Sequence, residues 1–240
     1  MGATPAGRPA IKGLLFDKDG TLLDFTATWV PVIRRAAASV AGEAKHRIEE
    51  LLEIGGFDAL AGRVRADSLL ASGNAAELAE AWGAATAHHH TETLERELDR
   101  LFTEEGIACA VPVTELRPLF TRLKERGLAL GVATSDGEAG ARGTLERFGV
   151  LELMDFVAGY DSGFGHKPGP GMVEGFCAAT GLAAGALAVI GDNRHDLEMG
   201  RRAGVALKIG VLTGNSTAED LAPHADQVIA SVAEIERLLG

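Results

Sequence analysis

The chain has 240 residues, and 46% of them are hydrophobic, which is typical of a globular protein that can bury a sizeable core. Its formal net charge of −11 argues against nucleic acid and anionic membranes as partners, because both bind to basic faces. With only two cysteines, Cys109 and Cys177, no disulfide framework is expected.

The first predicted element is an apolar strand over residues 14–16, and a long helical segment follows it. Residues 25–110 show helical patterns interrupted only by short turn-like pieces, for example over 32–40, 44–54, 75–87 and 91–104. A helical segment placed directly after the first strand is expected to be an insert. We therefore predict an inserted all-α domain over residues 25–110.

Helix and strand patterns alternate over the rest of the chain. The predicted helices cover residues 115–126, 138–148, 170–180, 196–203 and a last one that begins at Ser231, and the predicted strands cover 128–134, 156–159, 186–190, 205–212 and 227–230. Such alternation implies right-handed crossovers and a parallel sheet with helices on both faces. The sequence therefore predicts a Rossmann-like α/β core domain over residues 1–24 and 111–240.

Two aspartates, Asp17 and Asp19, follow the first strand in the run Asp-Lys-Asp-Gly-Thr. Side chains at positions i and i+2 of an extended segment point the same way, so both carboxylates can face one site. Carboxylates are hard oxygen ligands that suit Mg²⁺, and an ionised aspartate can attack phosphorus. By itself, the run would equally suit a turn with solvated acids.

Polar residues recur at the ends of later predicted strands. Thr134 ends one strand, and Asp192 and Asp196 follow another in Gly-Asp-Asn-Arg-His-Asp. Lys167 stands in Gly-His-Lys-Pro before a helix. Taken singly, these residues would suit a helix N-cap, acids at a helix start and a surface lysine.

The order of these four motifs resembles that of the haloacid-dehalogenase-like hydrolase superfamily, and within it the phosphoglycolate-phosphatase-like branch. The resemblance extends from about residue 11 to the end of the chain. It implies that the insert is the helical cap of that family. A cap at this place can cover the carboxyl edge of the sheet, exclude water and select substrates.

The resemblance also assigns roles to the motif residues. Asp17 would attack phosphorus to give an aspartyl-phosphate, and Asp19 would act as general acid and base. Thr134 would bind a phosphate oxygen, and Lys167 would neutralise the phosphoryl group and hold Asp17 by charge pairing. Mg²⁺ would be bound by the Asp17 carboxylate, the Asp19 backbone carbonyl and the Asp192 carboxylate.

Further residues are expected to support this site. Gly20, Ser135 and Asp136 are expected around the phosphate, which backbone N–H groups of the turn at 135–136 would help to bind. Gly20 also permits a tight exit from the strand, and Thr21 would orient the second aspartate or satisfy nearby backbone. Asp196 would lie beside the metal ligands or pair with the lysine, unless it is only a helix-start acid.

Two features depart from the family pattern or extend it. Lys18 occupies the middle of Asp-x-Asp, where an apolar residue is more usual, and strand alternation is expected to point it away from the carboxylates. In the insert, Arg63 and Arg65 would suit the binding of a substrate carboxylate or a second phosphate. Solvated surface arginines are an equally good interpretation.

The predicted function is a Mg²⁺-dependent phosphomonoester hydrolase acting on a small metabolite, with 2-phosphoglycolate as the first candidate. Haloacid dehalogenation would leave Asp19 unexplained, and phosphonate cleavage would need a cap lysine, for which only Lys45 is present. The alternatives are a phosphomutase, which shares all four motifs, and a non-catalytic phosphate-binding regulator.

The location is predicted from absences in the sequence. Residues 1–10 contain no apolar stretch of a signal peptide or anchor, and no run reaches the length of a membrane span. Together with the low cysteine content, this predicts a cytoplasmic protein without a membrane partner. The sequence leaves the oligomeric state open.

Overall fold

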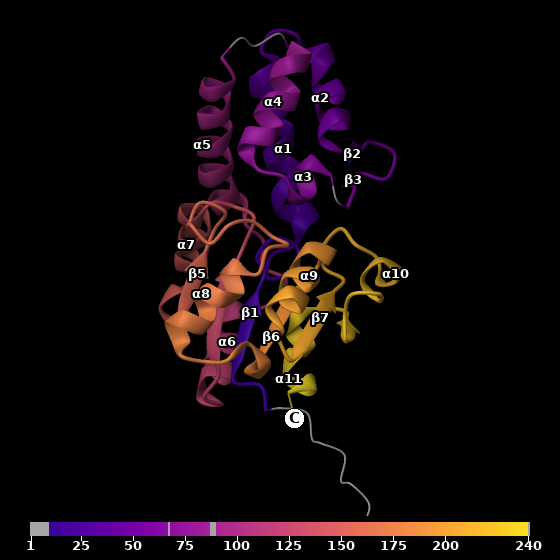
Figure 1. The fold of residues 1–240 in the computed structure, drawn as a ribbon. Coiled ribbons are helices and arrows are strands. Elements are labelled where there is room, and N and C mark those ends of the chain that lie inside the picture. The colour runs from indigo at the N-terminus through magenta and orange to yellow at the C-terminus, as the bar shows by residue number, and fades with distance from the viewer. Residues whose placement is uncertain (1–9, 67, 87–89, 240) are drawn as a thin grey trace, which may run out of the picture.

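The computed structural model describes residues 10–66, 68–86 and 90–239. Figure 1 shows two parts, one built around a sheet and a mostly helical one that stands over one edge of that sheet. The prediction for the N-terminal segment falls almost entirely on residues outside this description. No described helix combines the length and the apolar character that crossing a membrane requires.

The sheet has six parallel strands in the order β5-β4-β1-β6-β7-β8. The strands are β1 (Gly13–Phe16), β4 (Ala129–Ala133), β5 (Phe156–Ala158), β6 (Leu187–Gly191), β7 (Leu207–Val211) and β8 (Gln227–Ile229). β1 lies in the middle, where Leu14 pairs with Leu130 of β4 on one side and Ala188 of β6 on the other. The predicted parallel α/β core is confirmed.

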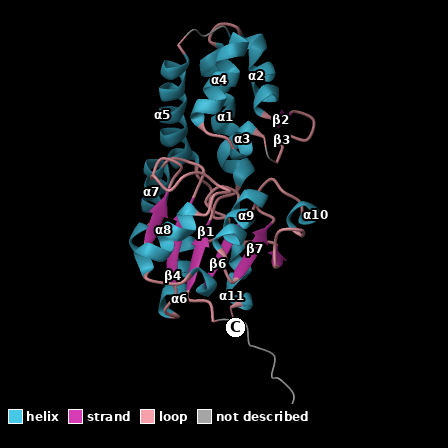
Figure 2. Ribbon diagram, viewed as in Figure 1, coloured by secondary structure: helices cyan, strands magenta, loops and turns pink. Residues whose placement is uncertain are grey.

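Helices cover both faces of this sheet, as Figure 2 shows. They are α6 (Leu116–Glu125), α7 (Glu138–Arg147), α8 (Gly171–Thr180), α9 (Arg194–Ala203), α10 (Ala218–Leu221) and α11 (Ile235–Leu238), with 3₁₀ turns at Leu151–Leu153, Ala184–Ala186 and Val232–Glu234. The sequence did not predict the one-turn helix α10 or the 3₁₀ turns at Leu151–Leu153 and Ala184–Ala186, because they are too short to show a hydrophobic period. The 3₁₀ turn at Val232–Glu234 lies at the start of the last predicted helix.

Alternation along β1 explains why the sheet is covered twice. Leu14 and Phe16 belong to one buried cluster, which includes Phe120 of α6. Leu15, which lies between them, belongs to another cluster with Phe176 of α8. A strand that is apolar on both faces is stable only between two layers of helices.

The insert over residues 25–110 has its own buried core, which includes Val32, Leu51 and Trp82. Its elements are α1 (Phe25–Ala41), α2 (Ile48–Gly55), β2 (Phe57–Asp58), β3 (Arg63–Val64), α3 (Leu69–Ser72), α4 (Ala75–Thr86) and α5 (Thr91–Cys109), with a 3₁₀ turn at Lys45–Arg47. Apart from β2 and β3, the described insert is helical or loop.

The prediction of an all-α insert therefore needs one correction, the antiparallel hairpin of β2 and β3. Gly56 follows α2 at a φ of 104°, which turns the chain away from the helix. The side chains of Phe57 and Val64 are then buried in the core of the insert. The Asp58 carboxylate accepts hydrogen bonds from two backbone N–H groups of the turn, both at 3.0 Å. Strands of two residues are too short to show alternation in the sequence.

Two neighbouring chain crossings join the insert to the core. The N–H of Asp24 donates to the Val111 carbonyl at 2.9 Å, and that of Val113 donates to the Leu22 carbonyl at 3.0 Å. The Asp24 side chain also caps α1 by accepting from the N–H of Ala27 at 2.8 Å. The predicted domain boundaries fall at these crossings, and the division into two domains stays a prediction.

Candidate active site

A cavity lies where the carboxyl ends of β1, β4 and β6 face the insert. The strand order changes direction at β1, because β4 and β6 lie on its two sides. Ligands of open α/β sheets bind at such a point. The residues that line the cavity include Asp17, Asp19, Thr134, Lys167, Asp192 and Asp196 of the predicted motifs.

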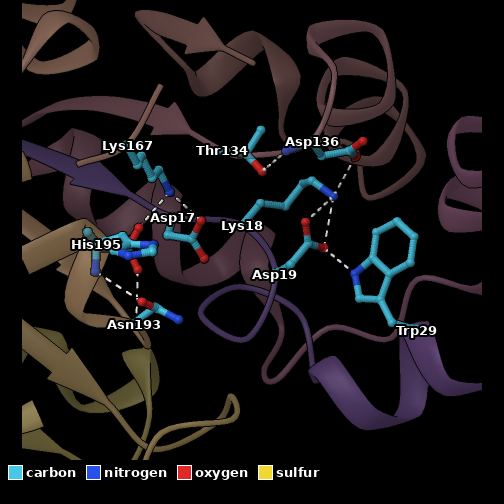
Figure 3. Close-up of polar contacts among 10 residues, drawn as sticks. Asp17, Lys18, Asp19, Trp29, Thr134, Asp136, Lys167, Asn193 and His195 are labelled. Atoms are coloured by element: carbon cyan, nitrogen blue, oxygen red, sulfur yellow. Dashed lines mark hydrogen bonds and ion pairs between the residues drawn. The ribbon is translucent and has the colours of Figure 1, made fainter. Parts of the chain in front are cut away.

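Asp17 follows directly after β1 and lies at the centre of the site. Its Oδ1 lies 2.6 Å from Lys167 Nζ, and the same ammonium lies 2.6 Å from Oδ1 of Asp196. All three side chains are nearly buried, with exposed fractions between 3% and 9%. The structure thus places both predicted partners against the lysine, and Figure 3 shows Asp17 beside it.

The proton affinities of these groups reflect their burial. Burial raises the pKa of the Asp17 carboxyl to about 7, although the Lys167 charge opposes the shift. Burial also raises the pKa of Asp192 well above its ordinary value, and the nearby Asp17 charge adds to the effect. Burial disfavours the charged form of Lys167, yet its two carboxylate partners raise its pKa. The site therefore has more negative charge than its own cation can balance.

Three buried carboxylates can meet a metal ion in this site. Asp17, Asp192 and Asp196 each offer an oxygen, and these oxygens lie within 4.8 Å of one another. Oδ2 of Asp17 is buried and has no hydrogen-bond partner among the described residues. Such an oxygen is costly unless a cation or a donor meets it. An all-oxygen set with this unmet atom fits Mg²⁺.

Asp19 is held by a residue of the insert and by its own neighbour in the chain. Trp29 of α1 donates its indole N–H to Oδ1 of Asp19 at 2.7 Å. Lys18 Nζ lies 2.9 Å from the same oxygen and 2.8 Å from Oδ2. The carboxylate is 15% exposed and lines the cavity, so it can still reach a bound ligand.

The expectation that Lys18 points away from the carboxylates is wrong. Its ammonium pairs with Asp19 at 2.8 Å and with Asp136 at 2.9 Å, and it lies 5.3 Å from the centre of the Trp29 ring. The side chain is only 2% exposed, and Figure 3 shows it between the two carboxylates. β1 ends at Phe16, so strand alternation no longer sets the direction of the next side chains.

The turn after β4 contains the predicted phosphate-binding residues. Thr134 Oγ1 accepts from the N–H of Asp136 at 3.1 Å, which leaves the hydroxyl proton for another acceptor. Ser135 lines the cavity. Asp136 differs from its predicted role, because its N–H is bound to Thr134 and its carboxylate to Lys18. Thr134 and Ser135 therefore lie where a phosphate group could bind, whereas Asp136 anchors the lysine.

Gly20 and Thr21 support the site from outside the cavity. Gly20 has a φ of 92°, and a Cβ there would lie 2.6 Å from the Asp192 carboxylate, so the position requires glycine. Its N–H donates to the Leu23 carbonyl at 2.9 Å and is not free for phosphate. Thr21 is fully buried and its Oγ1 has no partner among the described residues, so the predicted contact with Asp19 is not made.

The two predicted arginines of the insert do not reach the cavity. Arg63 and Arg65 are both exposed, on and just after β3, and neither lines the site. Arg65 donates through Nη2 to the Glu53 carbonyl at 3.3 Å. Of the two interpretations that the sequence left open, the surface one agrees with the structure.

Several cavity residues were missed by the sequence analysis. Tyr160 donates its hydroxyl to Oδ1 of Asp99 at 3.2 Å and so joins the core to α5 of the insert. Asn193 caps α9 by accepting from the N–H of His195 at 3.0 Å, and Asp196 completes the capping box. The N-cap could have been identified from Asn193 and Asp196 at their spacing. No sequence signal connects Asp99 with Tyr160.

Comparisons with known proteins agree with this geometry. A family model described as haloacid dehalogenase-like hydrolase matches residues 11–204. An N-acetylmuramic acid 6-phosphate phosphatase of Pseudomonas aeruginosa is 27% identical over 82% of this chain and 80% of that protein. A phosphoglycolate phosphatase of Pectobacterium atrosepticum is 25% identical over 96% of this chain and 93% of that protein.

One further sequence match covers part of the chain, and one solved structure matches its fold. A protein of Dickeya dadantii described as probable phosphatase IndB is 39% identical, over 45% of this chain and 46% of its own length. A solved structure described as a predicted phosphoglycolate phosphatase from Haemophilus somnus superposes with a TM-score of 0.73. That match covers 98% of this chain and 100% of the other at 17% identity, so it shows the fold alone.

Proposed function

Because the chain belongs to the haloacid dehalogenase-like hydrolase family, we propose that it is a Mg²⁺-dependent phosphomonoester hydrolase that forms an aspartyl-phosphate on Asp17. The environment of Asp17 carries this proposal. One carboxylate oxygen lies 2.6 Å from Lys167 Nζ, and the other is buried without a partner among the described residues. A carboxylate at the end of a central strand, facing a cavity and a lysine, is suited to attack phosphorus.

The residues of the site divide the reaction between them. Asp17 would attack phosphorus, the bond from phosphorus to the ester oxygen would break, and Asp19 would give its proton to that oxygen. Water would then attack the phosphorus of the aspartyl-phosphate, with Asp19 taking a proton, which releases phosphate and restores Asp17. The Thr134 hydroxyl and the Lys167 ammonium would hold the phosphoryl oxygens.

The metal would be held by Asp17 and Asp192, with Asp196 beside them. When bound, Mg²⁺ neutralises the carboxylates and the charge of the phosphoryl oxygens. The Asp19 backbone carbonyl stays the third predicted ligand.

A small phosphorylated metabolite is the proposed substrate class. The curated relatives named above include phosphatases named for N-acetylmuramic acid 6-phosphate and for phosphoglycolate, both small phosphomonoesters. The first candidate predicted from the sequence is 2-phosphoglycolate, and the cytoplasmic location stays a prediction.

Phosphate release from a panel of small phosphomonoesters tests the proposal, with Mg²⁺ added or removed by EDTA. We expect release only with the metal, and a loss of about 10³-fold or more in Asp17→Asn, as removal of a nucleophile causes in other enzymes. The control is Asp155→Asn, because this aspartate pairs with Lys124 outside the cavity. Its rate should stay close to that of the parent protein.

Two other outcomes would contradict the hydrolase. Phosphorylated Asp17 that accumulates without release of phosphate would indicate the phosphomutase. Neither release nor a phosphorylated protein would indicate a phosphate-binding regulator.

A further inference from the structure

The insert presents an apolar wall to the reaction site. Phe25, Trp29 and Ile33 of α1 line the cavity together with Leu78 of α4 and Phe102 of α5. The Trp29 and Phe102 rings meet edge to face with their centres 6.0 Å apart. Because the indole N–H of Trp29 is bound to Asp19, this wall stands beside the group that would protonate the leaving oxygen. The leaving group of the substrate would therefore pack on it.

The polar groups on the insert side of the cavity are acidic or neutral. Asp99 of α5 lines the cavity, and its Oδ1 accepts from the Tyr160 hydroxyl at 3.2 Å. Burial and the Asp99 charge raise the pKa of Tyr160 to about 12, so its hydroxyl stays a neutral donor. Asn74 lines the cavity before α4, whose start it caps together with Glu77 through hydrogen bonds of 3.1 and 3.0 Å. The start of α4 is therefore already occupied by the Glu77 carboxylate and does not attract an anionic group of the substrate.

No arginine or lysine in the described part of the insert lines this cavity. Five of the arginines contact other groups instead: Arg34 pairs with Glu49, Arg35 with Glu105 and Arg100 with Glu104, while Arg47 and Arg65 donate to the carbonyls of Ala85 and Glu53. An anionic group on the leaving side would find no arginine or lysine of the described insert residues there.

The core offers few cations for a second anionic group. Lys167 is bound between Asp17 and Asp196, where the phosphoryl group would lie. Lys18 is bound between Asp19 and Asp136. His195 lines the cavity from α9 of the core, and Figure 3 shows it on the other side of Asp17 from Trp29.

We propose, on the premise of the proposed function, that the substrate has an apolar leaving group that is uncharged or carries an ammonium facing Asp99. Apolar surface gains free energy when it is buried against the aromatic wall. An ammonium near Asp99 gains Coulomb energy, whereas a carboxylate would lose its hydration beside a like charge. Carboxylate-bearing esters such as 2-phosphoglycolate are therefore expected to be poor substrates, and Asp99 sets the preference.

Three matched aryl esters test this inference on the Mg²⁺-loaded protein: phenyl phosphate, 4-(aminomethyl)phenyl phosphate and 4-carboxyphenyl phosphate. We expect kcat/KM for the aminomethyl ester to exceed that for the carboxy ester by about tenfold or more. Asp99→Asn should reduce this ratio by about tenfold, and comparing the ratio between proteins cancels the intrinsic reactivity of the esters.

Two further variants separate the Asp99 charge from other effects. Glu97→Gln removes the same charge from an exposed position of α5 that does not line the cavity, so it should leave the ratio unchanged. Tyr160→Phe removes the hydroxyl partner but keeps the Asp99 carboxylate, so the preference for the ammonium should persist.

The outcomes distinguish this inference from the proposed function. If phenyl phosphate is hydrolysed and the carboxy ester reacts as fast as the aminomethyl ester, the inference fails and the hydrolase stands. The same holds if Asp99→Asn folds and keeps the parent ratio. If none of the three esters is hydrolysed while other esters of the panel are, the inference fails and the hydrolase stands. If no ester of either set is hydrolysed, the proposed function fails and the inference fails with it. The comparison of the aminomethyl and carboxy esters on the parent protein needs no variant. It can therefore contradict the inference even if Asp99→Asn does not fold.

Discussion

Lys18 joins two turns of the site through one ammonium group. It lies between Asp19, which follows β1, and Asp136, which follows β4. Burial disfavours its charge, yet the two carboxylates raise its pKa, so it stays protonated. A buried ion pair adds little net stability, but removal of one partner leaves an unpaired buried charge and is costly.

Lys18→Met is therefore expected to lower the free energy of unfolding by about 3–5 kcal/mol, because both carboxylates lose the cation between them. Urea denaturation measures this change. Lys208→Met is the control, since its partner Asp226 is 37% exposed and the loss there should be at most about 1 kcal/mol. Equal losses in the two variants would contradict the role of Lys18.

A second prediction concerns the hydrogen bond from Trp29 to Asp19. Trp29→Phe keeps an aromatic ring in the wall but removes the donor at 2.7 Å, so Asp19 would be less well positioned. Loss of a hydrogen bond to a charged group is expected to reduce kcat about tenfold for alkyl phosphates. The loss should be smaller for 4-nitrophenyl phosphate, whose leaving group needs little help from a proton.

Trp82→Phe serves as the matched control for this change. Trp82 is buried in the cap core and donates to the Leu51 carbonyl at 2.7 Å, away from the site. Trp82→Phe should lower the stability of the protein, but any change in kcat should be the same for the alkyl phosphates and for 4-nitrophenyl phosphate. A Trp29→Phe variant that slows both esters equally would show that the indole acts only as packing.

At the scale of elements, the start of α9 connects helix capping with the site. The Asn193 N–H donates to Oδ2 of Asp196 at 3.1 Å, and the other carboxylate oxygen accepts from Lys167 at 2.6 Å. One aspartate thus completes the capping box and orients the lysine that pairs with Asp17. The short loop from β6 to α9 fixes both functions in place.

Asn193→Ala is expected to destabilise the protein by about 1 kcal/mol through the lost side-chain cap on the His195 N–H. The backbone N–H that donates to Asp196 remains, but the first turn of α9 is held less firmly, so Asp196 should orient Lys167 less well and kcat should fall. Thermal unfolding and phosphate release measure the two effects. Helix α10 provides the control, since Thr217 and Asp220 form the same capping box outside the cavity. Thr217→Ala should lose similar stability with its activity unchanged. Unchanged activity in Asn193→Ala would argue against the coupling.

At the scale of the whole molecule, the acidic site makes stability depend on pH and metal. The Asp17 pKa of about 7 in the folded protein compares with 3.8 for a free side chain. Between these values the folded state binds more protons than the unfolded state. The stabilisation is therefore full at low pH and is lost as the pH rises through 7. Asp192 shifts in the same direction. Metal binding must displace these protons.

Without metal, the unfolding temperature should therefore fall as the pH is raised from about 5 to about 8. Mg²⁺ should raise the unfolding temperature more at about pH 8 than at about pH 5. Thermal unfolding in EDTA and in Mg²⁺ at both pH values measures the effect. Asp17→Asn should reduce the pH dependence, because the amide does not titrate. A gain from Mg²⁺ that is the same at both pH values would contradict the assignment of the metal to these carboxylates.

The core, the place of the insert and the positions of the motif residues could all be predicted from the amino-acid sequence. Parallel strands bring their carboxyl ends to one edge, so polar residues that follow β1, β4 and β6 had to meet there. This is why Asp17, Thr134 and Asp192 could be placed together before any contact was known.

Which side chains complete the site depends on how distant parts of the chain pack together. Lys18 lies beyond the strand, where local alternation gives no direction, and its partner Asp136 comes from a distant turn. Trp29 reaches Asp19, and Asp99 reaches Tyr160, only because the insert is docked over the sheet edge. Local sequence patterns encode periodicity and turns, whereas these contacts depend on how the insert packs against the edge of the sheet.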